Sequence, residues 1–256
     1  MGTNLKFYED NKLTDLCTYG FTSANESVSQ FLYDRDPTTK IISVGSDDDT
    51  DEVFQVTFPS PVLIDTIFVL GHNIKLGTLR YGTSDDIDFS PILNWSGNAT
   101  PNTMFSFTPT TVSKLFLRLQ DAMIEDAQKF VSNFVATKLI GEVQKNPSKL
   151  DFGYKDAKIV GQTYTGGSYT ALFGRKASIK ASFTDASDTD VSLFRTIHDL
   201  GDPVFVQMNG GVNSYTQDGF RTQDIFLMNW VNDFEPKLKS DMIGIGALID
   251  VEMKEV

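Results

Sequence analysis

Apolar side chains fall in short runs along most of the chain, and polar, glycine and proline residues separate these runs. In residues 53–61, VFQVTFPSP, apolar and polar positions partly alternate, which predicts a strand with one buried face that Pro59 and Pro61 end. Residues 64–70, IDTIFVL, are almost continuously apolar. That pattern is typical of a strand buried on both faces or lying between two sheets.

The pattern continues beyond a predicted turn at residues 71–73, GHN. Extended structure is expected to resume at 79–81 and again at 114–119, where leucines at alternate positions share one face. Residues 121–143 remain ambiguous, because part of the segment has helical spacing and part has the composition of a strand. Short strands separated by turns at these intervals predict a β-sandwich.

The second half of the chain contains the clearest helix signal. Ser187 or Asp188 can cap the first turn of a helix at 188–200, apolar residues then form one stripe, and Gly201 ends it. Strands are predicted around this helix at 164–175, 177–183, 204–208, 225–231 and 243–253. The first two are joined at Gly174 and are interpreted as a hairpin or two adjacent strands, and a Gly-rich loop is predicted at 209–222.

The length of 256 residues favours two domains. The polar segment QKNPSK at 144–149 is the predicted linker. We therefore predict a mainly β protein with a β-sandwich at 1–145 and a smaller β-rich domain at 150–256 that carries one α-helix.

Charge and composition exclude several function classes. The formal net charge is −12, with Lys and Arg scattered singly, so nucleic-acid binding is not expected. No apolar run reaches the roughly 20 residues that span a bilayer, so no membrane insertion is expected. Cys17 is the only cysteine, which excludes an intrachain disulfide and a thiolate metal site.

The two histidines, His72 and His198, lie far apart in sequence, and neither has the i, i+4 partner of a zinc-binding helix. His198 is predicted in the last turn of the helix, where it can interact with the helix dipole. His72 is predicted to hold the GHN turn by hydrogen-bonding nearby backbone. Because no GxSxG motif is present and Cys17 has no recognisable companion, hydrolysis by Ser or Cys is disfavoured.

Acidic residues cluster in two predicted loops. The first loop, GSDDDTDE at 45–52, offers oxygen ligands for calcium but lacks the EF-hand spacing, so a solvated loop and a calcium site are both kept as interpretations. The second group, at residues 85–88, is interpreted as a turn. Paired carboxylates could also hydrolyse glycosides, although nothing in the sequence places two of them across a cleft. No catalytic, cofactor-binding or metal-binding residue is assigned, and no cofactor is expected. The clustered carboxylates are Asp47, Asp48, Asp49, Asp51 and Glu52 in the first loop and Asp85, Asp86 and Asp88 in the second.

Two segments resemble the discoidin-like domains of tailed-phage virion proteins. FLYDRDPTTKIIS at 31–43 is similar to a segment of the type L-x-D-x-D-x-x-T, and IDTIFVLGHN at 64–73 is similar to a strand I-D-T-I that leads into G-H-N. KLIGEV at 138–143 resembles the closing strand of such a jelly-roll sandwich. The family's usual Trp after the Thr is replaced here by Lys40, Ile41 and Ile42. The matched positions are Leu32, Asp34, Asp36, Thr39, Ile64, Asp65, Thr66, Ile67, Gly71, His72 and Asn73.

The second half is similar, in the order of its elements, to tail-tube and distal-tail proteins of such phages. This resemblance implies a non-enzymatic structural component of a phage tail or baseplate, located in the virion after assembly in the host cytoplasm. Its expected partners are copies of itself in a ring, with the sandwich on the outside, and other tail or baseplate proteins. The alternative is a carbohydrate-binding module or adhesin that recognises host-surface glycans, for which Trp95 and Trp230 are candidate stacking residues.

Overall fold

The computed structural model describes residues 5–22, 26–34, 39–43, 51–82, 90–162, 168–208, 225–238 and 247–255. The chain divides into two compact units. Residues 11–139 and 212–223 form one, here called the sandwich unit, and residues 1–10, 140–211 and 224–256 form the other, the helix unit. The predicted fold class is confirmed, because the described residues form β-strands with a single α-helix. The loop 209–222 lies outside the described residues.

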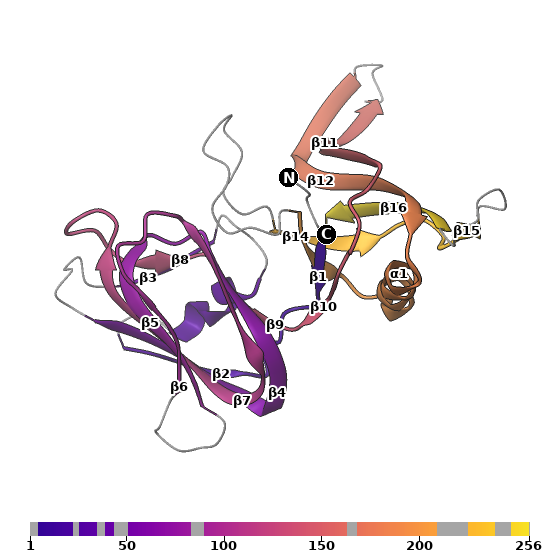
Figure 1. Ribbon diagram of the computed structural model, residues 1–256. Coiled ribbons are helices and arrows are strands. Elements are labelled where there is room, and N and C mark those ends of the chain that lie inside the picture. Colours follow the sequence, from indigo (N-terminus) through magenta and orange to yellow (C-terminus); the bar gives the residue numbers. More distant parts are fainter. Residues whose placement is uncertain are drawn as a thin grey trace. The chain divides into compact units, whose positions relative to one another are not determined.

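The sandwich unit is built on a six-stranded antiparallel sheet of order β2-β4-β7-β5-β6, with β9 paired to β4. A 3-10 helix, η1 (Glu26–Leu32), and a two-stranded sheet complete the unit. Figure 1 shows β4 and β7 running side by side through most of the sandwich unit. The strands are β2 (Thr18–Phe21), β3 (Ile41–Ile42), β4 (Glu52–Leu70), β5 (Ile74–Gly82), β6 (Ser90–Trp95), β7 (Asn102–Ala122), β8 (Phe130–Val131) and β9 (Asn133–Thr137).

One long strand, β4, replaces the two strands predicted at 53–61 and 64–70. The prediction that Pro59 and Pro61 end a strand is wrong, because β4 continues through both residues to Leu70. The ladder with β7 shifts register between Thr57 and Val62. Proline lacks an N–H and is tolerated at such an irregularity, where no ladder bond is required of it.

The core of the sandwich unit explains the apolar pattern. Phe54 and Val56 from the first half of β4 pack in one cluster with Ile67 and Val69 from its second half. β7 contributes the leucines predicted to share a face, and each of these is fully buried. The ambiguous segment 121–143 forms β8, β9 and β10, so its apolar residues obey a strand pattern and the helical spacing was coincidental.

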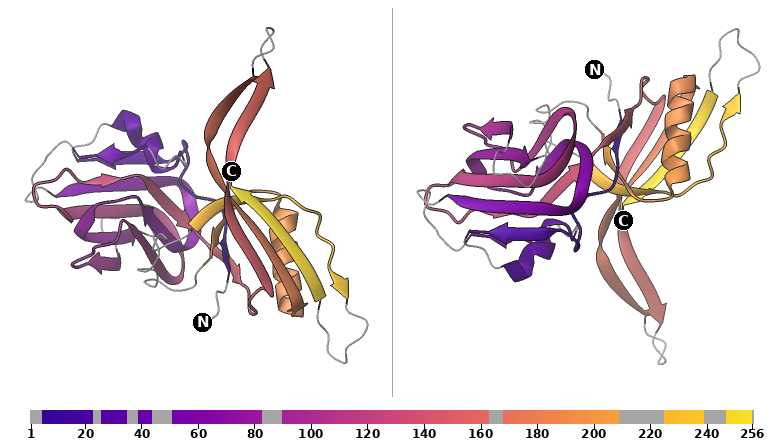
Figure 2. Two further views of the ribbon diagram at one scale, coloured as in Figure 1. Left: turned by 90° about the horizontal axis from the view of Figure 1, so that it is seen from above. Right: turned by 90° about the horizontal axis from the view of Figure 1, so that it is seen from below.

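The helix unit contains an eight-stranded sheet of order β10-β1-β13-β14-β16-β12-β11, with β15 paired to β16. Helix α1 (Asp188–Leu200) crosses one face of this sheet, and the outer ends of β11 and β12 project beyond the other strands (Figure 2). The strands are β1 (Lys6–Tyr8), β10 (Leu139–Glu142), β11 (Lys149–Gln162), β12 (Ser168–Ala186), β13 (Val204–Gln207), β14 (Ile225–Trp230), β15 (Lys237–Leu238) and β16 (Ala247–Glu255).

The helix begins and ends where the sequence predicts. Ser187 is the N-cap and accepts from the N–H of Asp190, whose side chain returns the bond to the N-cap in a capping box. Gly201 ends the helix with φ 66°. Phe194 and Ile197 are buried beneath the helix, and the Phe194 ring lies 4.9 Å from that of Phe183 in β12.

Two predictions in this half are wrong. No hairpin turn occurs at Gly174, because β12 runs unbroken from Ser168 to Ala186 and pairs with β11 along its length. The segment 144–149 is not a loose linker: Gln144 N–H donates to Asp190 at 2.8 Å and Ser148 N–H donates to Ser182 at 2.8 Å, both within the helix unit. The chain passes from the helix unit to the sandwich unit between residues 10 and 11 and returns between residues 139 and 140. The first strand, β1, accordingly pairs with β13 of the helix unit.

Candidate functional site

The turn between β4 and β5 carries His72, whose side chain is 1% exposed. Its Nδ1 accepts from the backbone N–H of Ile74 at 3.1 Å, and its Nε2 lies 2.8 Å from Oγ1 of Thr103. Because a nitrogen that accepts carries no proton, the neutral ring is protonated on Nε2 and donates to Thr103. Burial lowers the pKa of His72 to about 4, so the ring is neutral at pH 7. The prediction that the ring hydrogen-bonds nearby backbone is confirmed.

The residues on either side of His72 complete the turn. Gly71 has φ 61°, and a Cβ added there would lie 2.6 Å from Oγ of Ser132. Asn73 donates to the carbonyl of Gln128 at 2.7 Å and accepts from the N–H of Phe130 at 2.9 Å. The GHN turn therefore ties the β4–β5 connection to the segment that leads into β9.

This geometry does not suit general-base catalysis by His72. In the neutral tautomer the ring donates to the Thr103 hydroxyl, so it cannot also remove that hydroxyl's proton. The other nitrogen, Nδ1, accepts the backbone N–H of Ile74, and a backbone amide does not release its proton near neutral pH. His72 is a structural residue of the sandwich unit.

Other residues of the two segments that resemble discoidin-like domains also make structural contacts. Thr39 Oγ1 donates to Asp34 Oδ2 at 2.8 Å, which joins two positions of the L-x-D-x-D-x-x-T segment. Asp65 Oδ1 accepts from the N–H of Leu139 at 2.9 Å, just beyond the end of β9, the strand that pairs with β4. Asp36 lies outside the described residues.

His198 lies in the last turn of α1 as predicted, and its ring packs edge-on against Trp230 at 5.9 Å. Nδ1 of His198 is 3.2 Å from the carboxylate of Asp199. The Trp230 ring also packs against that of Phe234, with ring centroids 6.1 Å apart. This tryptophan therefore belongs to the edge of the core and not to a surface on which a sugar ring stacks. The side chain of Trp95, the other candidate, lies outside the described residues.

The described acidic residues do not form a metal site. Asp51 pairs with Arg118, whose Nε donates to the carboxylate at 2.9 Å. Glu52 is 1% exposed and accepts from Thr22 Oγ1 at 3.0 Å. Among the described residues no group of three or more His, Cys, Asp or Glu side chains could hold an ion. The remaining members of the two predicted clusters, Asp47, Asp48, Asp49, Asp85, Asp86 and Asp88, lie outside the described part of the chain.

Two tyrosines of the sandwich unit form a surface that combines aromatic and acidic groups. Tyr19 in β2 and Tyr33 after η1 stack with ring centroids 5.5 Å apart and an interplanar angle of 17°. Both rings rest on the core but remain partly exposed. Burial, and then the charge of the Asp15 carboxylate, raise the pKa of Tyr33, and Asp34 adds to the shift. We call Asp15, Tyr19, Tyr33 and Asp34 the tyrosine cluster.

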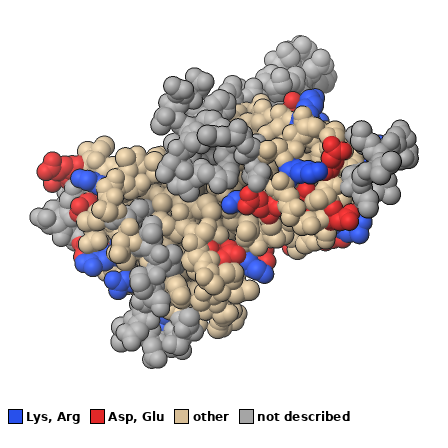
Figure 3. Space-filling model, in the orientation of Figure 1, with Lys and Arg blue, Asp and Glu red and all other residues tan. Residues whose placement is uncertain are grey.

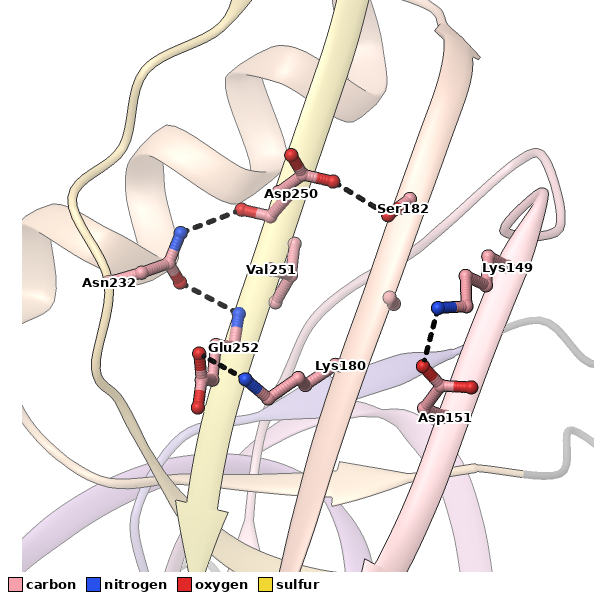
Figure 4. Close-up of a pocket in the computed structure, with 9 residues that line it drawn as sticks. Lys149, Asp151, Lys180, Ser182, Asn232, Asp250, Val251 and Glu252 are labelled. Carbon is pink, nitrogen blue, oxygen red and sulfur yellow. Dashed lines mark hydrogen bonds and ion pairs between the residues drawn. The ribbon is translucent and has the colours of Figure 1, made fainter.

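A second polar surface lies on three strands of the helix unit (Figure 4). Lys149 is 2.9 Å from Asp151, Lys180 is 2.9 Å from Glu252, and Ser182 donates to Asp250 at 2.6 Å. These side chains line a shallow groove on the face of β11, β12 and β16, opposite α1. Because its charges are paired with one another, along β11 and between β12 and β16, we interpret this polar ladder as a solvated sheet face.

The charge of the protein does not gather into one patch on the visible face. In Figure 3, Lys and Arg atoms alternate with Asp and Glu atoms over the described residues. The net charge of −12 and this mixed surface are both unlike a phosphate-binding face. Among the described residues no helix is long and apolar enough to span a bilayer.

Comparison with known proteins gives only distant structural similarities. Neither the family models nor the curated proteins compared with the chain gave a match. Chitosan-binding module 1 from a chitosanase/glucanase of Paenibacillus sp. IK-5 is 10% identical, with 50% of this chain and 98% of that chain covered, at a TM-score of 0.44. CpGH89CBM32-5 from Clostridium perfringens, in complex with GalNAc-β-1,3-galactose, is 13% identical, with 48% and 94% covered, at 0.40.

A fucosidase of Ruminococcus gnavus, in complex with fucose, is 8% identical, with 51% of this chain and 26% of that chain covered, at a TM-score of 0.43. The similar structures thus include modules matched over almost their full length and longer enzymes matched over only part of theirs. No functional residue is carried over from any of them.

Sequence reasoning missed the tyrosine cluster. Tyr19 and Tyr33 are 14 positions apart and belong to different elements, so no periodicity relates them. Only the tertiary fold brings the two rings together. Tyr33 does fall within the FLYDRDPTTKIIS segment, but the similarity there concerned its acidic and hydroxyl positions.

Proposed function

We propose that the protein is a non-catalytic carbohydrate-binding protein in which the tyrosine cluster of the sandwich unit contacts the sugar. The observation that carries the proposal is the stacked, partly exposed ring pair of Tyr19 and Tyr33 with carboxylates beside it. The negative face of an aromatic ring attracts the C–H groups of a pyranose, and carboxylates accept hydrogen bonds from its hydroxyls. This alternative was left open by the sequence.

The cluster is also held in place before any ligand arrives. Tyr19 Oη donates to the carbonyl of Thr14 at 2.8 Å, and Thr39 donates to Asp34 at 2.8 Å. Groups that are already oriented lose less conformational entropy on binding, which favours affinity. Neither His72 nor the buried Cys17 is arranged for covalent or acid–base chemistry, which supports binding without turnover.

The test is a glycan array probed with the full-length chain, followed by calorimetry on the best glycan. Tyr33→Ala should weaken binding by about fivefold to thirtyfold, since loss of one well-packed aromatic contact costs roughly 1 to 2 kcal/mol. Tyr81→Ala is the matched control, because Tyr81 also stacks, on Phe107 at 5.7 Å, elsewhere in the same unit. An array without signal, or equal effects of the two variants, would sink the proposal.

A second candidate is a structural component of a phage tail or baseplate that assembles as a ring of identical subunits. The observation that favours it is the sheet of the helix unit, whose order ends at β10 on one side and β11 on the other. In the described part of the chain no strand continues the sheet beyond either end, and open edges of this kind pair readily with another chain. A repeated edge contact between identical subunits can close into a ring.

This second candidate makes a different prediction about where the protein is found. It should co-purify with phage particles and be visible in their tails by labelling with an antibody to the chain. Particles free of the protein would remove this candidate while leaving the carbohydrate proposal intact.

A further inference from the structure

The tyrosine cluster contains a carboxylate that pairs with no basic side chain of the described residues. Asp15 and Asp34 are both exposed. Asp34 accepts from the hydroxyl of Thr39, a neutral donor, at 2.8 Å. The ion pairs formed among the described residues do not include Asp15. Within the described part of the chain, the negative charge of Asp15 is therefore not balanced by a cation.

The turn that carries Asp15 is fixed against one of the two stacked rings. Oη of Tyr19 donates to the carbonyl of Thr14, the residue before Asp15, at 2.8 Å. The N–H of Leu16 donates to the hydroxyl of Thr14 at 3.2 Å, so the turn is also held by a bond of its own. These bonds keep Asp15 next to the ring pair of Tyr19 and Tyr33.

The side-chain charges that act on the two rings are negative. Burial, followed by the charge of Asp15, raises the pKa of Tyr33. Burial is also the largest cause of the raised pKa of Tyr19, and the charge of Asp15 adds to it. No Lys or Arg of the described residues opposes either shift. The surface of the ring pair is therefore a place where positive charge is favoured.

A protonated amino group suits this arrangement. An ammonium donates three hydrogen bonds, and both a carboxylate and the face of a tyrosine ring attract it. A neutral sugar would keep its contact with the aromatic ring but would gain nothing from the charge. An acidic sugar would be repelled by Asp15, and the net charge of −12 adds to that repulsion at longer range.

We infer that the tyrosine cluster selects sugars that carry a free amino group, with the ammonium beside Asp15 and the C–H face of the sugar ring on the tyrosines. Arg35, which follows Asp34 in sequence, lies outside the described residues, so the ammonium contact is assigned to Asp15 alone. The inference rests on the proposed carbohydrate-binding function and narrows its ligands from sugars in general to basic amino sugars.

The selectivity that this contact gives is modest. Because Asp15 is exposed, its charge should contribute only about twofold to fivefold in affinity. The contact between the ammonium and a tyrosine ring should add a factor of similar size. Together they predict a preference of about tenfold for an amino sugar over its neutral counterpart.

The first test is titration calorimetry of the full-length chain with two tetramers of the same linkage, one of glucosamine and one of N-acetylglucosamine. Acetylation removes the positive charge and keeps the sugar ring. In a mildly acidic buffer of low salt, the glucosamine tetramer should bind about tenfold more tightly, and most of the difference should disappear at about 1 M salt.

The outcomes separate this inference from the proposed function. Equal affinities at low salt, tighter binding of the N-acetylated tetramer, or binding only to neutral sugars of the glycan array would overturn the preference for amino sugars. Each of these results would leave carbohydrate binding intact. A chain that binds no sugar in either experiment would remove both.

The second test assigns the preference to Asp15. Asp15→Asn removes the charge with little change of shape, so it should lower the ratio of the two affinities by about twofold to fivefold. Asp202→Asn is the matched control, because it removes one exposed carboxylate from the helix unit and changes the net charge equally. An equal fall of the ratio in both variants, or no fall with Asp15→Asn, contradicts a local contact. Circular dichroism checks that each variant is folded.

Discussion

His72 and Thr103 are joined by a 2.8 Å contact from ring Nε2 to side-chain Oγ1, and the opposite nitrogen accepts the N–H of Ile74. One imidazole thus links the β4–β5 turn to β5 itself and to β7. The adjacent backbone adds to the link, because Gly71 N–H donates to Asn102 and His72 N–H donates to the carbonyl of Pro101, both at 2.8 Å. The turn is a junction of three strands.

Gly71→Ala should destabilise the sandwich unit by about 3 kcal/mol. An L-residue at φ 61° costs roughly 1 to 2 kcal/mol, and the new Cβ would also meet Ser132 Oγ at 2.6 Å. Gly97→Ala is the control. Gly97 has φ 66°, but nothing lies within 4 Å of the added Cβ, so this variant should lose only the roughly 1 to 2 kcal/mol of the strained backbone conformation. Urea unfolding followed by circular dichroism measures both. Equal losses would show that contact with Ser132 is unimportant.

The stability of the sandwich unit should depend on pH through His72. The pKa of His72 is about 4 in the folded chain, against 6.5 for a solvent-exposed histidine, so between those pH values the unfolded state binds one proton more than the folded state. The free energy of unfolding therefore falls as pH is lowered from about 6.5 to about 4, by roughly 3 kcal/mol as an upper bound, and does not change further below that window on account of this group.

His72→Gln provides the comparison, because glutamine does not titrate. The difference in unfolding free energy between parent and variant should shrink as pH falls through this window, since only the parent loses stability by this route. The transition to follow is the one that Gly71→Ala shifts. A difference that stays constant from pH 7 to pH 4 would mean that the ring is not held neutral by burial.

The sequence predicted elements well where local pattern decides them. The helix at 188–200 has its cap, stripe and stop residues within one segment, and all three are found. The course of β4 could not be predicted, because Pro59 and Pro61 usually end strands and only the partner β7 shows that the ladder resumes beyond them. The division between the units could not be predicted either, because β1 pairs with β13, about 200 positions away in the sequence.

The candidate sites were less predictable still. The sequence predicts a structural role for His72 because no catalytic partner lies near it in sequence, but it does not identify Thr103 and Ile74 as the residues that His72 contacts. The tyrosine cluster combines residues from separate elements. Spacing along the chain carries no information about such pairs, and only burial and distance identify them.

Replacing Asp190 should destabilise the helix unit more than replacing Ser187, the N-cap residue to which Asp190 is hydrogen-bonded. Its carboxylate is fully buried and accepts from the Ser187 hydroxyl at 2.9 Å and from Gln144 N–H at 2.8 Å. Ser187→Ala should cost about 1 kcal/mol, and Asp190→Ala about 3 kcal/mol because it leaves buried donors without an acceptor. The exposed Asp188→Ala is the control, with a loss of about 0.5 kcal/mol or less. If Asp190→Ala costs no more than Ser187→Ala, the bond to Gln144 contributes nothing.

The ion pair between Lys180 and Glu252 should contribute little, despite its 2.9 Å separation. Lys180 is half exposed, and solvent and side-chain entropy offset most of the attraction, so a double-mutant cycle should give a coupling of about 1 kcal/mol or less that falls further at 1 M salt. The buried bond from Tyr8 Oη to Gln207 Oε1, 2.8 Å long in the same unit, is the contrast. Tyr8→Phe should cost about 1 to 2 kcal/mol at any salt concentration, because it removes a neutral donor from a buried acceptor. A larger coupling for the exposed pair than the loss on Tyr8→Phe would mean that the polar ladder stabilises the sheet, and that its charges are not screened as their exposure predicts.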